Sequence, residues 1–169
     1  MNIADLPKLA MTGDVLLVHG QSKFQRVIQL DTVSPFCHVA MIVVPQPGML
    51  VVCEMVEEEG YQSMLIADWF AGRPNDNIFF GRAPAIVRQN GKIIENSLQE
   101  YAVKDKRAYG YGELLKVWMS QITGQEYETE HEVCSLFCAH RWEIAGYRIP
   151  GCPSPGDFLF HCRSVCFMR

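Results

Sequence analysis

The sequence predicts an α+β fold in which an antiparallel sheet packs against helices. Two observations lead to this class. The first half of the chain contains short apolar runs that are rich in β-branched residues and separated by turn residues, as strands are. The second half instead repeats apolar residues at the spacing of amphipathic helices. Strands gathered before helices favour an α+β domain over a doubly wound sheet, in which the two kinds of element alternate.

The predicted strands all lie before residue 83. The runs 38–44 and 49–54 flank a Pro/Gly turn at 45–48, so we expect them to form a β-hairpin. A short apolar run that follows Gly13 is predicted to be the first strand of the domain. The complete set of predicted strands is 15–18, 38–44, 49–54, 60–66 and 78–82.

Helices are predicted between and after the strands. Ser22 can cap a helix that ends near Asp31, and a short helical turn with a loop is expected over 68–77. Ser97 and Glu100 have the spacing of a capping box, which would begin another helix. Two further helices are predicted to end at Gly124 and Gly146, and their apolar stripes are Tyr111, Leu114, Leu115, Trp118 and Ile122, and Val133, Leu136, Phe137, His140 and Ile144. The tail 150–155 is predicted to be irregular, and a short apolar run follows at 158–160.

Composition predicts a single globular domain that spans residues 1–169. Of the 169 residues, 49% are apolar and 20% are charged, which is enough apolar material for a buried core. The formal net charge is −4 and basic residues do not gather on one face, so no nucleic-acid partner is expected. No apolar run reaches about 18 residues and no signal-peptide pattern opens the chain. We therefore expect no integral membrane segment and a cytoplasmic location, with export by a route without a signal, or a phage source, left open.

Seven cysteines are many for a chain of this length, but their pattern indicates neither disulfides nor metal. Their number is odd and no secretion signal is present, which disfavours a disulfide framework. The spacing C-x-x-C, which structural zinc sites use most often, does not occur. We expect neither a metal nor another cofactor, and most of these cysteines are predicted to be small buried apolar residues.

Three residues could combine into a catalytic site. His38 begins a predicted central strand, Glu54 lies near the end of the next strand, and Cys134 lies at or just inside the start of a helix. The positive end of a helix and a neighbouring imidazolium both favour a thiolate, which is the nucleophilic form of cysteine. The imidazole can then donate a proton to a leaving group, and a third polar group can orient the imidazole. The combination predicts a thiol nucleophile, Cys134, with His38 as its general base.

The contact between His38 and Glu54 depends on the geometry of the hairpin. With a symmetric four-residue loop, His38 would lie opposite Met55, and Glu54 would point to the other face of the sheet. We therefore predict a loop of odd length or a β-bulge in this hairpin. Without either, Glu57 or Gln62 would have to supply the third group.

Other residues compete for roles in this site. Cys138 lies one helical turn beyond Cys134 on roughly the same face, but it is farther from the positive end of the helix. Cys37 precedes His38 and is expected to point to the opposite face. His140 falls on an apolar stripe and is predicted to lie in the core, whereas His131 is close enough in sequence to Cys134 to line a pocket.

Short blocks along most of the chain form a recognisable ordered set. They are Gly13-Asp14-Val15-Leu16-Leu17, Ser34-Pro35-Phe36-Cys37-His38-Val39-Ala40-Met41-Ile42, Val51-Val52-Cys53-Glu54, Val133-Cys134-Ser135-Leu136-Phe137 and Pro153-Ser154-Pro155-Gly156-Asp157-Phe158, with Tyr109 to Tyr111 between the third and fourth. This set resembles the circularly permuted NlpC-type papain-like superfamily, in particular its YiiX-like cysteine peptidases and more distantly the lecithin:retinol acyltransferase-like proteins, in which a helix entry is common at the place of Tyr109 to Tyr111. Two positions depart from the pattern: Ala40 stands where the family often has Gly, and Leu136-Phe137 replaces a common Glu-Leu-Val.

The resemblance implies a single permuted papain-like domain with a cysteine hydrolase activity. In this branch the order is His, acid, Cys, so it implies His38 as base, Glu54 as orienting group and Cys134 as nucleophile. It also implies that the backbone N–H of Cys134 contributes to an oxyanion hole, for which Tyr109 and Tyr111 are candidate second donors. The implied substrate is a peptide or acyl-amide, foremost a cell-wall (murein) peptide. Two alternatives remain open: a thiol acyltransferase or lipid hydrolase, and a binding module without catalysis.

Overall fold

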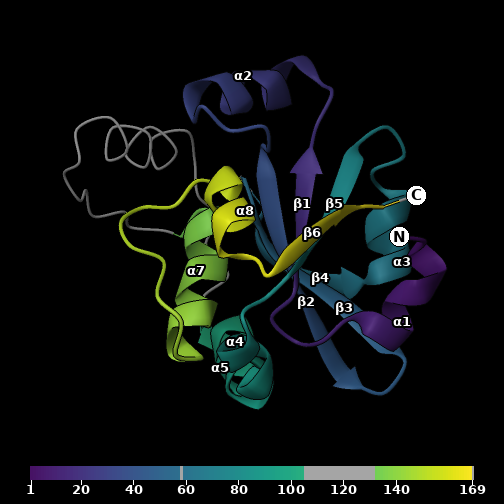
Figure 1. Ribbon diagram of the computed structural model, residues 1–169, viewed down its shortest axis with the longest axis vertical. Coiled ribbons are helices and arrows are strands. Elements are labelled where there is room, and N and C mark those ends of the chain that lie inside the picture. Colours follow the sequence, from purple (N-terminus) through teal and green to yellow (C-terminus); the bar gives the residue numbers. More distant parts are fainter. Residues whose placement is uncertain (58, 105–131, 169) are drawn as a thin grey trace.

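The computed structural model describes residues 1–57, 59–104 and 132–168, and its centre is a six-stranded sheet (Figure 1). The spatial order of the strands is β4-β3-β2-β1-β5-β6, and every neighbouring pair is antiparallel. The strands are β1 (Val15–His19), β2 (His38–Gln46), β3 (Met49–Val56), β4 (Gly60–Leu65), β5 (Asn77–Arg82) and β6 (Ser164–Phe167). The predicted α+β class, antiparallel sheet and first five strands are confirmed.

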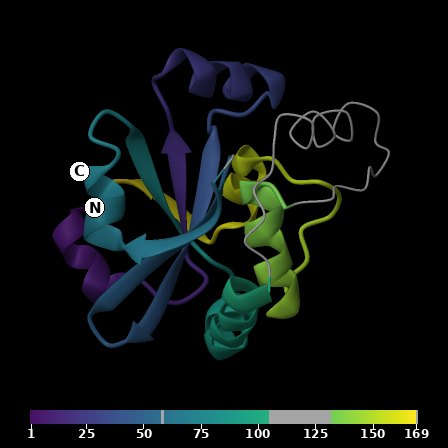
Figure 2. The ribbon, with the colours of Figure 1, turned by 180° about the vertical axis from the view of Figure 1, so that it is seen from behind.

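Helices cover both faces of this sheet, as Figures 1 and 2 show from opposite sides. The α-helices are α1 (Leu6–Leu9), α2 (Lys23–Asp31), α3 (Ile66–Ala71), α4 (Ala85–Gln89), α5 (Gly91–Lys104), α7 (Cys134–Ile144) and α8 (Phe158–His161). Two 3₁₀ turns, Ile3–Asp5 and Pro155–Asp157, precede α1 and α8. Among the residues that the structure describes, no helix is both long and apolar enough to cross a bilayer.

Alternation of side chains along the strands builds two cores. Odd-numbered residues of β1 and β2, such as Leu17 and Met41, pack against α5 and α7 on one face. Even-numbered residues, such as Leu16 and Ile42, pack on the other face with Trp69 of α3 and with α1. Because both faces of the central strands are buried, the sequences of these strands are continuous apolar runs.

The hairpin of β2 and β3 contains the predicted irregularity. The register shifts between Val43 and Gln46, so that Val44 and Pro45 of β2 oppose the single residue Leu50 of β3. This arrangement is a β-bulge. Pro45 is tolerated there because a bulged residue does not have to donate a hydrogen bond to the ladder.

The bulge decides which face of the sheet Glu54 occupies. The register pairs Met41 with Cys53, and its continuation places Ala40 opposite Glu54. His38, two residues before Ala40, therefore points to the same face as Glu54. The prediction of a bulge or an odd loop is confirmed, and the need for Glu57 or Gln62 as substitutes disappears.

One expectation about the helices is wrong. Ser97 does not begin a helix, because α5 already starts at Gly91 and the Ser97 hydroxyl donates to the Ile94 carbonyl within it. The apolar run 158–160 forms the single turn α8, and the edge strand β6 follows it. The predicted helix that ends at Gly124 lies outside the described residues.

Two helix boundaries that the sequence predicted are present. Ser22 accepts a hydrogen bond from the Gln25 backbone, and the Gln25 side chain accepts one from the Ser22 backbone, which completes a capping box at α2. At the other end of the fold, α7 terminates before Gly146, whose φ of +93° is the left-handed conformation that glycine adopts without strain.

Candidate active site

The loop that leads into β2 sets the position of His38. The hydroxyl of Ser34 donates to the Phe36 carbonyl and accepts from the Phe36 amide, and the Cys37 amide donates to the Val18 carbonyl of β1. These contacts lock the turn directly before the strand. His38 is thereby held as the first residue of β2, at the end of the sheet where its ring is partly accessible.

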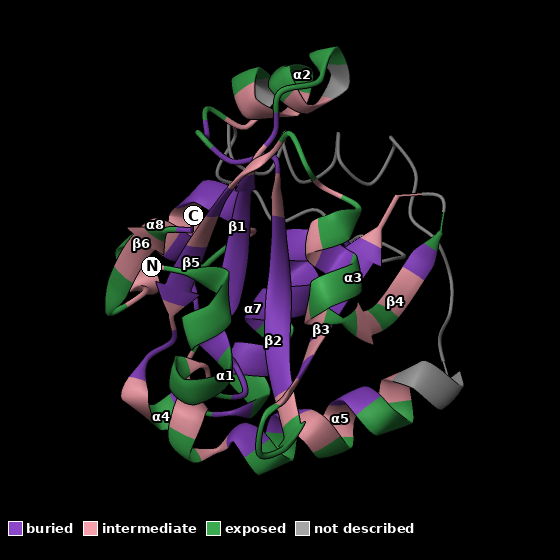
Figure 3. Cartoon of the chain, turned by 90° about the vertical axis from the view of Figure 1, so that its right-hand side faces the viewer, coloured by how far each residue is buried: buried purple, intermediate pink, exposed green. Residues whose placement is uncertain are grey.

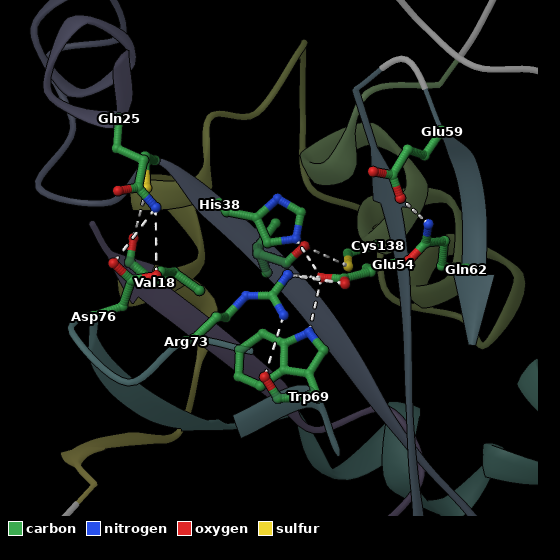
Figure 4. Close-up of polar contacts among 12 residues, drawn as sticks. Val18, Gln25, His38, Glu54, Glu59, Gln62, Trp69, Arg73, Asp76 and Cys138 are labelled. Carbon is green, nitrogen blue, oxygen red and sulfur yellow. Dashed lines mark hydrogen bonds and ion pairs between the residues drawn. The ribbon is translucent and has the colours of Figure 1, made fainter. Parts of the chain in front are cut away.

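The carboxylate of Glu54 collects most of the polar contacts in this region (Figure 4). His38 Nε2 lies 2.7 Å from Oε2, and Trp69 Nε1 donates to the same oxygen over 2.9 Å. Arg73 Nη2 lies 3.0 Å from Oε1 and 3.1 Å from Oε2. Because only 1% of the Glu54 side chain is exposed, these donors replace water for a buried charge.

Arg73 is itself fixed by Trp69. Its guanidinium carbon lies 4.1 Å from the centroid of the indole ring, and its Nη1 donates to the Trp69 carbonyl over 3.3 Å. Both residues come from α3 and the loop that follows it, a segment that the sequence predicted only as a helical turn and a loop. No local pattern marks them as site residues, because their role depends on the packing of α3 against β3.

The charges of the site shift the pKa values of His38 and Glu54 in opposite directions. Burial by itself would lower the pKa of His38, but the interactions of the imidazole with Cys134 and then with Glu54 raise it to about 10. Burial would raise the pKa of Glu54, but the hydrogen bond and charge of His38, followed by the charge of Arg73, lower it to about 2. At neutral pH, Glu54 is therefore ionised and His38 holds a proton.

Cys134 approaches His38 from the first turn of α7. It is the first residue of the helix, it is 4% exposed, and its interaction with the His38 side chain raises the pKa of that imidazole. Since Nε2 of His38 faces Glu54, the other ring nitrogen, Nδ1, is the one left for the thiol. Val133 at the N-cap provides no side-chain hydrogen bond, so the first N–H groups of α7 are not capped by it.

The site lies where the two cores meet. Trp69 belongs to the core on one face of the sheet, whereas Cys134 belongs to the core on the other face. His38, at the end of β2, pairs with Glu54 and also interacts with Cys134. The structure thus brings the three predicted site residues together and adds Trp69 and Arg73 to them.

The competing residues have other environments. Cys138 is fully buried, its thiol faces the Val39 carbonyl at 3.9 Å, and burial holds its pKa well above the usual range. The thiol of Cys37 donates to the Val18 carbonyl over 3.3 Å, and burial raises its pKa to about 11. Neither thiol is placed to serve as the nucleophile, because an un-ionised thiol is a poor one.

His140 is not a core residue, contrary to its prediction from the apolar stripe. Its side chain is half exposed and pairs with Glu132, which precedes α7. The stripe was misleading because α7 is buried around most of its circumference, so His140 occupies one of its few exposed positions. The predicted pocket residue His131 and the candidate donors Tyr109 and Tyr111 lie outside the described residues.

Comparison with known proteins identifies a structural neighbour. No protein-family model and no curated protein matches the sequence. A crystal structure described as the metalloprotein YiiX from Escherichia coli O157:H7 (DUF1105) superposes with a TM-score of 0.52 and 18% sequence identity. The match covers 94% of this chain and 96% of that chain. The chain therefore has a YiiX-like fold.

Proposed function

We propose that this protein is a cysteine hydrolase with a permuted papain-like (NlpC-type) domain, in which Cys134 is the nucleophile, His38 the general acid and base, and Glu54 the orienting carboxylate. The observation that carries the proposal is the position of the His38 ring. One nitrogen lies 2.7 Å from a buried carboxylate, and the ring also interacts with the side chain of Cys134, the first residue of a helix. A nucleophile, a base and a group that orients the base are the parts of a catalytic triad.

The reaction that suits these groups is hydrolysis of an amide or peptide bond in two steps. The Cys134 thiolate attacks the carbonyl carbon, the C–N bond breaks, and the His38 imidazolium gives its proton to the leaving amine. Water then attacks the carbonyl carbon of the thioester and gives a proton to His38, the C–S bond breaks, and the carboxylic acid leaves as the Cys134 thiolate is regenerated. The backbone N–H groups at the start of α7 are suited to stabilise the oxyanion in both steps.

Cell-wall (murein) peptides are the proposed substrates. This choice rests on the resemblance of the His38, Glu54 and Cys134 blocks to those of YiiX-like cysteine peptidases and on the YiiX-like fold. Acyl lipids are the alternative, and a direct comparison of the two substrate classes separates them.

The word metalloprotein in the description of YiiX raises the question of a metal in this site. Across residues 1–57, 59–104 and 132–168, no three His, Cys, Asp or Glu side chains are grouped so that they could hold an ion. The carboxylate of Glu54 already accepts from Trp69 and Arg73. The described residues do not fit a metal centre, and the proposed steps do not pass through one.

The decisive experiment measures alkylation of each cysteine by iodoacetamide as a function of pH, with peptide mapping. In the parent protein we expect Cys134 to react well below about pH 8, where ordinary thiols are protonated. His38→Ala is expected to abolish the labelling of Cys134 below about pH 8. Cys53 and Cys138 serve as internal controls, because burial raises the pKa of each.

Activity is then assayed on murein peptides and on acyl-lipid esters in the parent and in Cys134→Ser. Release of new amino groups from murein peptides by the parent alone supports the amidase proposal. Turnover of the lipid ester alone replaces it with the acyl-lipid alternative. If Cys134 labels no faster than Cys138, and His38→Ala changes nothing, the cysteine hydrolase proposal is wrong.

A further inference from the structure

Helix α2 exposes two of its apolar residues and turns two glutamines toward the protein, although Ile28 packs partly against the core. Val27 and Leu30 are 49% and 77% exposed, and Val33, just beyond the helix, is 93% exposed. Gln25 and Gln29, by contrast, face the protein and are only partly exposed. A surface helix normally has the opposite arrangement, with its apolar stripe toward the core.

Hydrogen bonds hold the helix in this orientation. Gln29 donates to the Pro35 carbonyl over 3.0 Å, and its amide lies 3.3 Å from His19 Nδ1. Gln25 Nε2 donates to the Asp76 carboxylate over 3.4 Å. A rotation that buried Leu30 would break these contacts, so the outward apolar face is built into the fold.

Val33 adds a second unusual feature to the same surface. Its φ of +48° is left-handed, a conformation that a β-branched residue adopts only at a cost in free energy. An exposed turn of this kind favours Gly or Asn over Val on grounds of stability. A valine that is both strained and exposed indicates that its apolar side chain serves something outside the chain.

The position and charge of α2 point to the partner. The helix lies at one end of the long axis of the molecule, beyond the sheet end that carries His38 (Figures 1 and 3). Lys23 and Arg26 are exposed on the same helix as Val27 and Leu30. Protruding apolar side chains beside basic ones are the features by which a helix enters the headgroup layer of an anionic membrane.

We propose that α2 and Val33 form a docking surface for an anionic lipid bilayer, with Val27, Leu30 and Val33 inserted among the lipids and Lys23 and Arg26 against the headgroups. A protein partner fits this surface less well. A stable protein interface takes about 20 residues from each side, whereas here three apolar residues project from a nine-residue helix and the turn that follows it, at the tip of the molecule. The surface is independent of the chemistry proposed for Cys134.

Binding of the full chain to vesicles tests this proposal. Co-sedimentation at low and high salt compares vesicles of phosphatidylcholine alone with vesicles of equal parts phosphatidylcholine and phosphatidylglycerol. We expect binding to the anionic vesicles that weakens as salt screens the charges. The double substitution Leu30→Gln/Val33→Gln should lower the partition coefficient by about tenfold, and Lys23→Gln/Arg26→Gln by at least as much.

Leu9→Gln and Leu65→Gln are the matched controls, because both leucines are exposed (43% and 48%) but lie on other elements. Both should bind like the parent, and circular dichroism with urea unfolding verifies that every variant is folded. Absence of vesicle binding by the parent overturns the proposal. Binding that is unaffected by the α2 substitutions also overturns it, as does a concentration-dependent dimer that those substitutions abolish.

Discussion

Arg73 holds the carboxylate of Glu54 through both oxygens, and Glu54 in turn holds His38. Removing one partner of a buried charged pair leaves the other charge without compensation, which costs more than the pair contributes when it is intact. Arg73 is therefore a positioning residue in the proposed site. Its effect on Cys134 has to pass through Glu54 and His38.

Arg73→Met should slow alkylation of Cys134 by roughly tenfold and destabilise the fold by about 1.5–3 kcal/mol. The physical reason is that Glu54 loses its cation, so its pKa rises and its hold on the protonated His38 weakens. Arg73→Lys keeps the charge without the fork geometry and should fall between the parent and Arg73→Met. Arg148→Met, on an exposed side chain, is the control, and equal alkylation in all four proteins would show that Arg73 does not position the site.

The free energy of unfolding should fall at both acid and alkaline pH, and both changes should come from the Glu54–His38 pair. The folded pKa of Glu54, about 2, is below its ordinary value of 4.5, so its stabilising effect is present above pH 4.5 and is lost as pH falls toward 2. The folded pKa of His38, about 10, is above its ordinary 6.5, so its effect is complete below pH 6.5 and is lost as pH rises through 10.

Urea unfolding of the parent, Glu54→Gln and His38→Ala across this pH range measures both changes. Glu54→Gln should lose less stability than the parent between pH 4.5 and 2, and His38→Ala less between pH 6.5 and 10. Parallel curves for the three proteins would contradict the assignment of these titrations to the pair.

At the scale of elements, the hairpin shows what the sequence could and could not predict about the site. His38, Glu54 and Cys134 could be selected because their residue types and their places on predicted elements match a known chemistry. Side-chain alternation alone was enough to predict a bulge or an odd loop. The location of the bulge at Val44 and Pro45 depends on the pairing of β2 with β3, which the sequence does not show. Arg73 could not be predicted, because only the packing of α3 on β3 brings it to Glu54.

The capping patterns illustrate the same limit. Ser22 with Gln25 and Ser97 with Glu100 have identical spacing, but only the first pair lies at the start of a helix. Ile94 and Leu98, which are both buried, extend the apolar face of α5 across Ser97, and packing of this face outweighs the local preference for a cap.

Ser22→Ala should therefore destabilise the protein by about 1 kcal/mol, because the Gln25 amide loses its acceptor at the first turn of α2. Ser97→Ala is the matched control and should be neutral or slightly stabilising, because alanine has the higher helix propensity and the hydroxyl bonds only within its own helix. Urea unfolding at neutral pH measures both changes. Equal effects of the two substitutions would contradict the assigned helix boundaries.

At the scale of the whole molecule, the site depends on how α7 is seated on the sheet. Glu54 and Trp69 belong to one face, and Cys134 comes from the helix packed on the other. The distance between Cys134 and His38 is therefore set by the packing of a whole layer. Trp142, fully buried near the far end of α7, is the largest side chain that fixes this layer.

Trp142 joins α7 to two distant segments of the chain. Its indole N–H donates to the Gly13 carbonyl over 2.8 Å, and its ring packs edge-on against Phe158 with centroids 5.0 Å apart. Trp142→Ala should cost about 3–5 kcal/mol through the cavity it leaves. Trp142→Phe fills most of that space, but the buried Gly13 carbonyl loses its hydrogen-bond donor. This substitution should cost about 1–3 kcal/mol.

Urea unfolding measures these costs, and Phe160→Ala, an aromatic side chain that is 84% exposed, should stay within about 0.5 kcal/mol of the parent. Trp142→Phe also tests the link between packing and chemistry, because it is expected to remain folded. If the packing of α7 on the sheet sets the contact between Cys134 and His38, alkylation of Cys134 below about pH 8 should be slower in this variant, although no residue of the site has changed. Full retention of that alkylation would mean that the first turn of α7 is held by its local contacts with β2, independently of the far end of the helix.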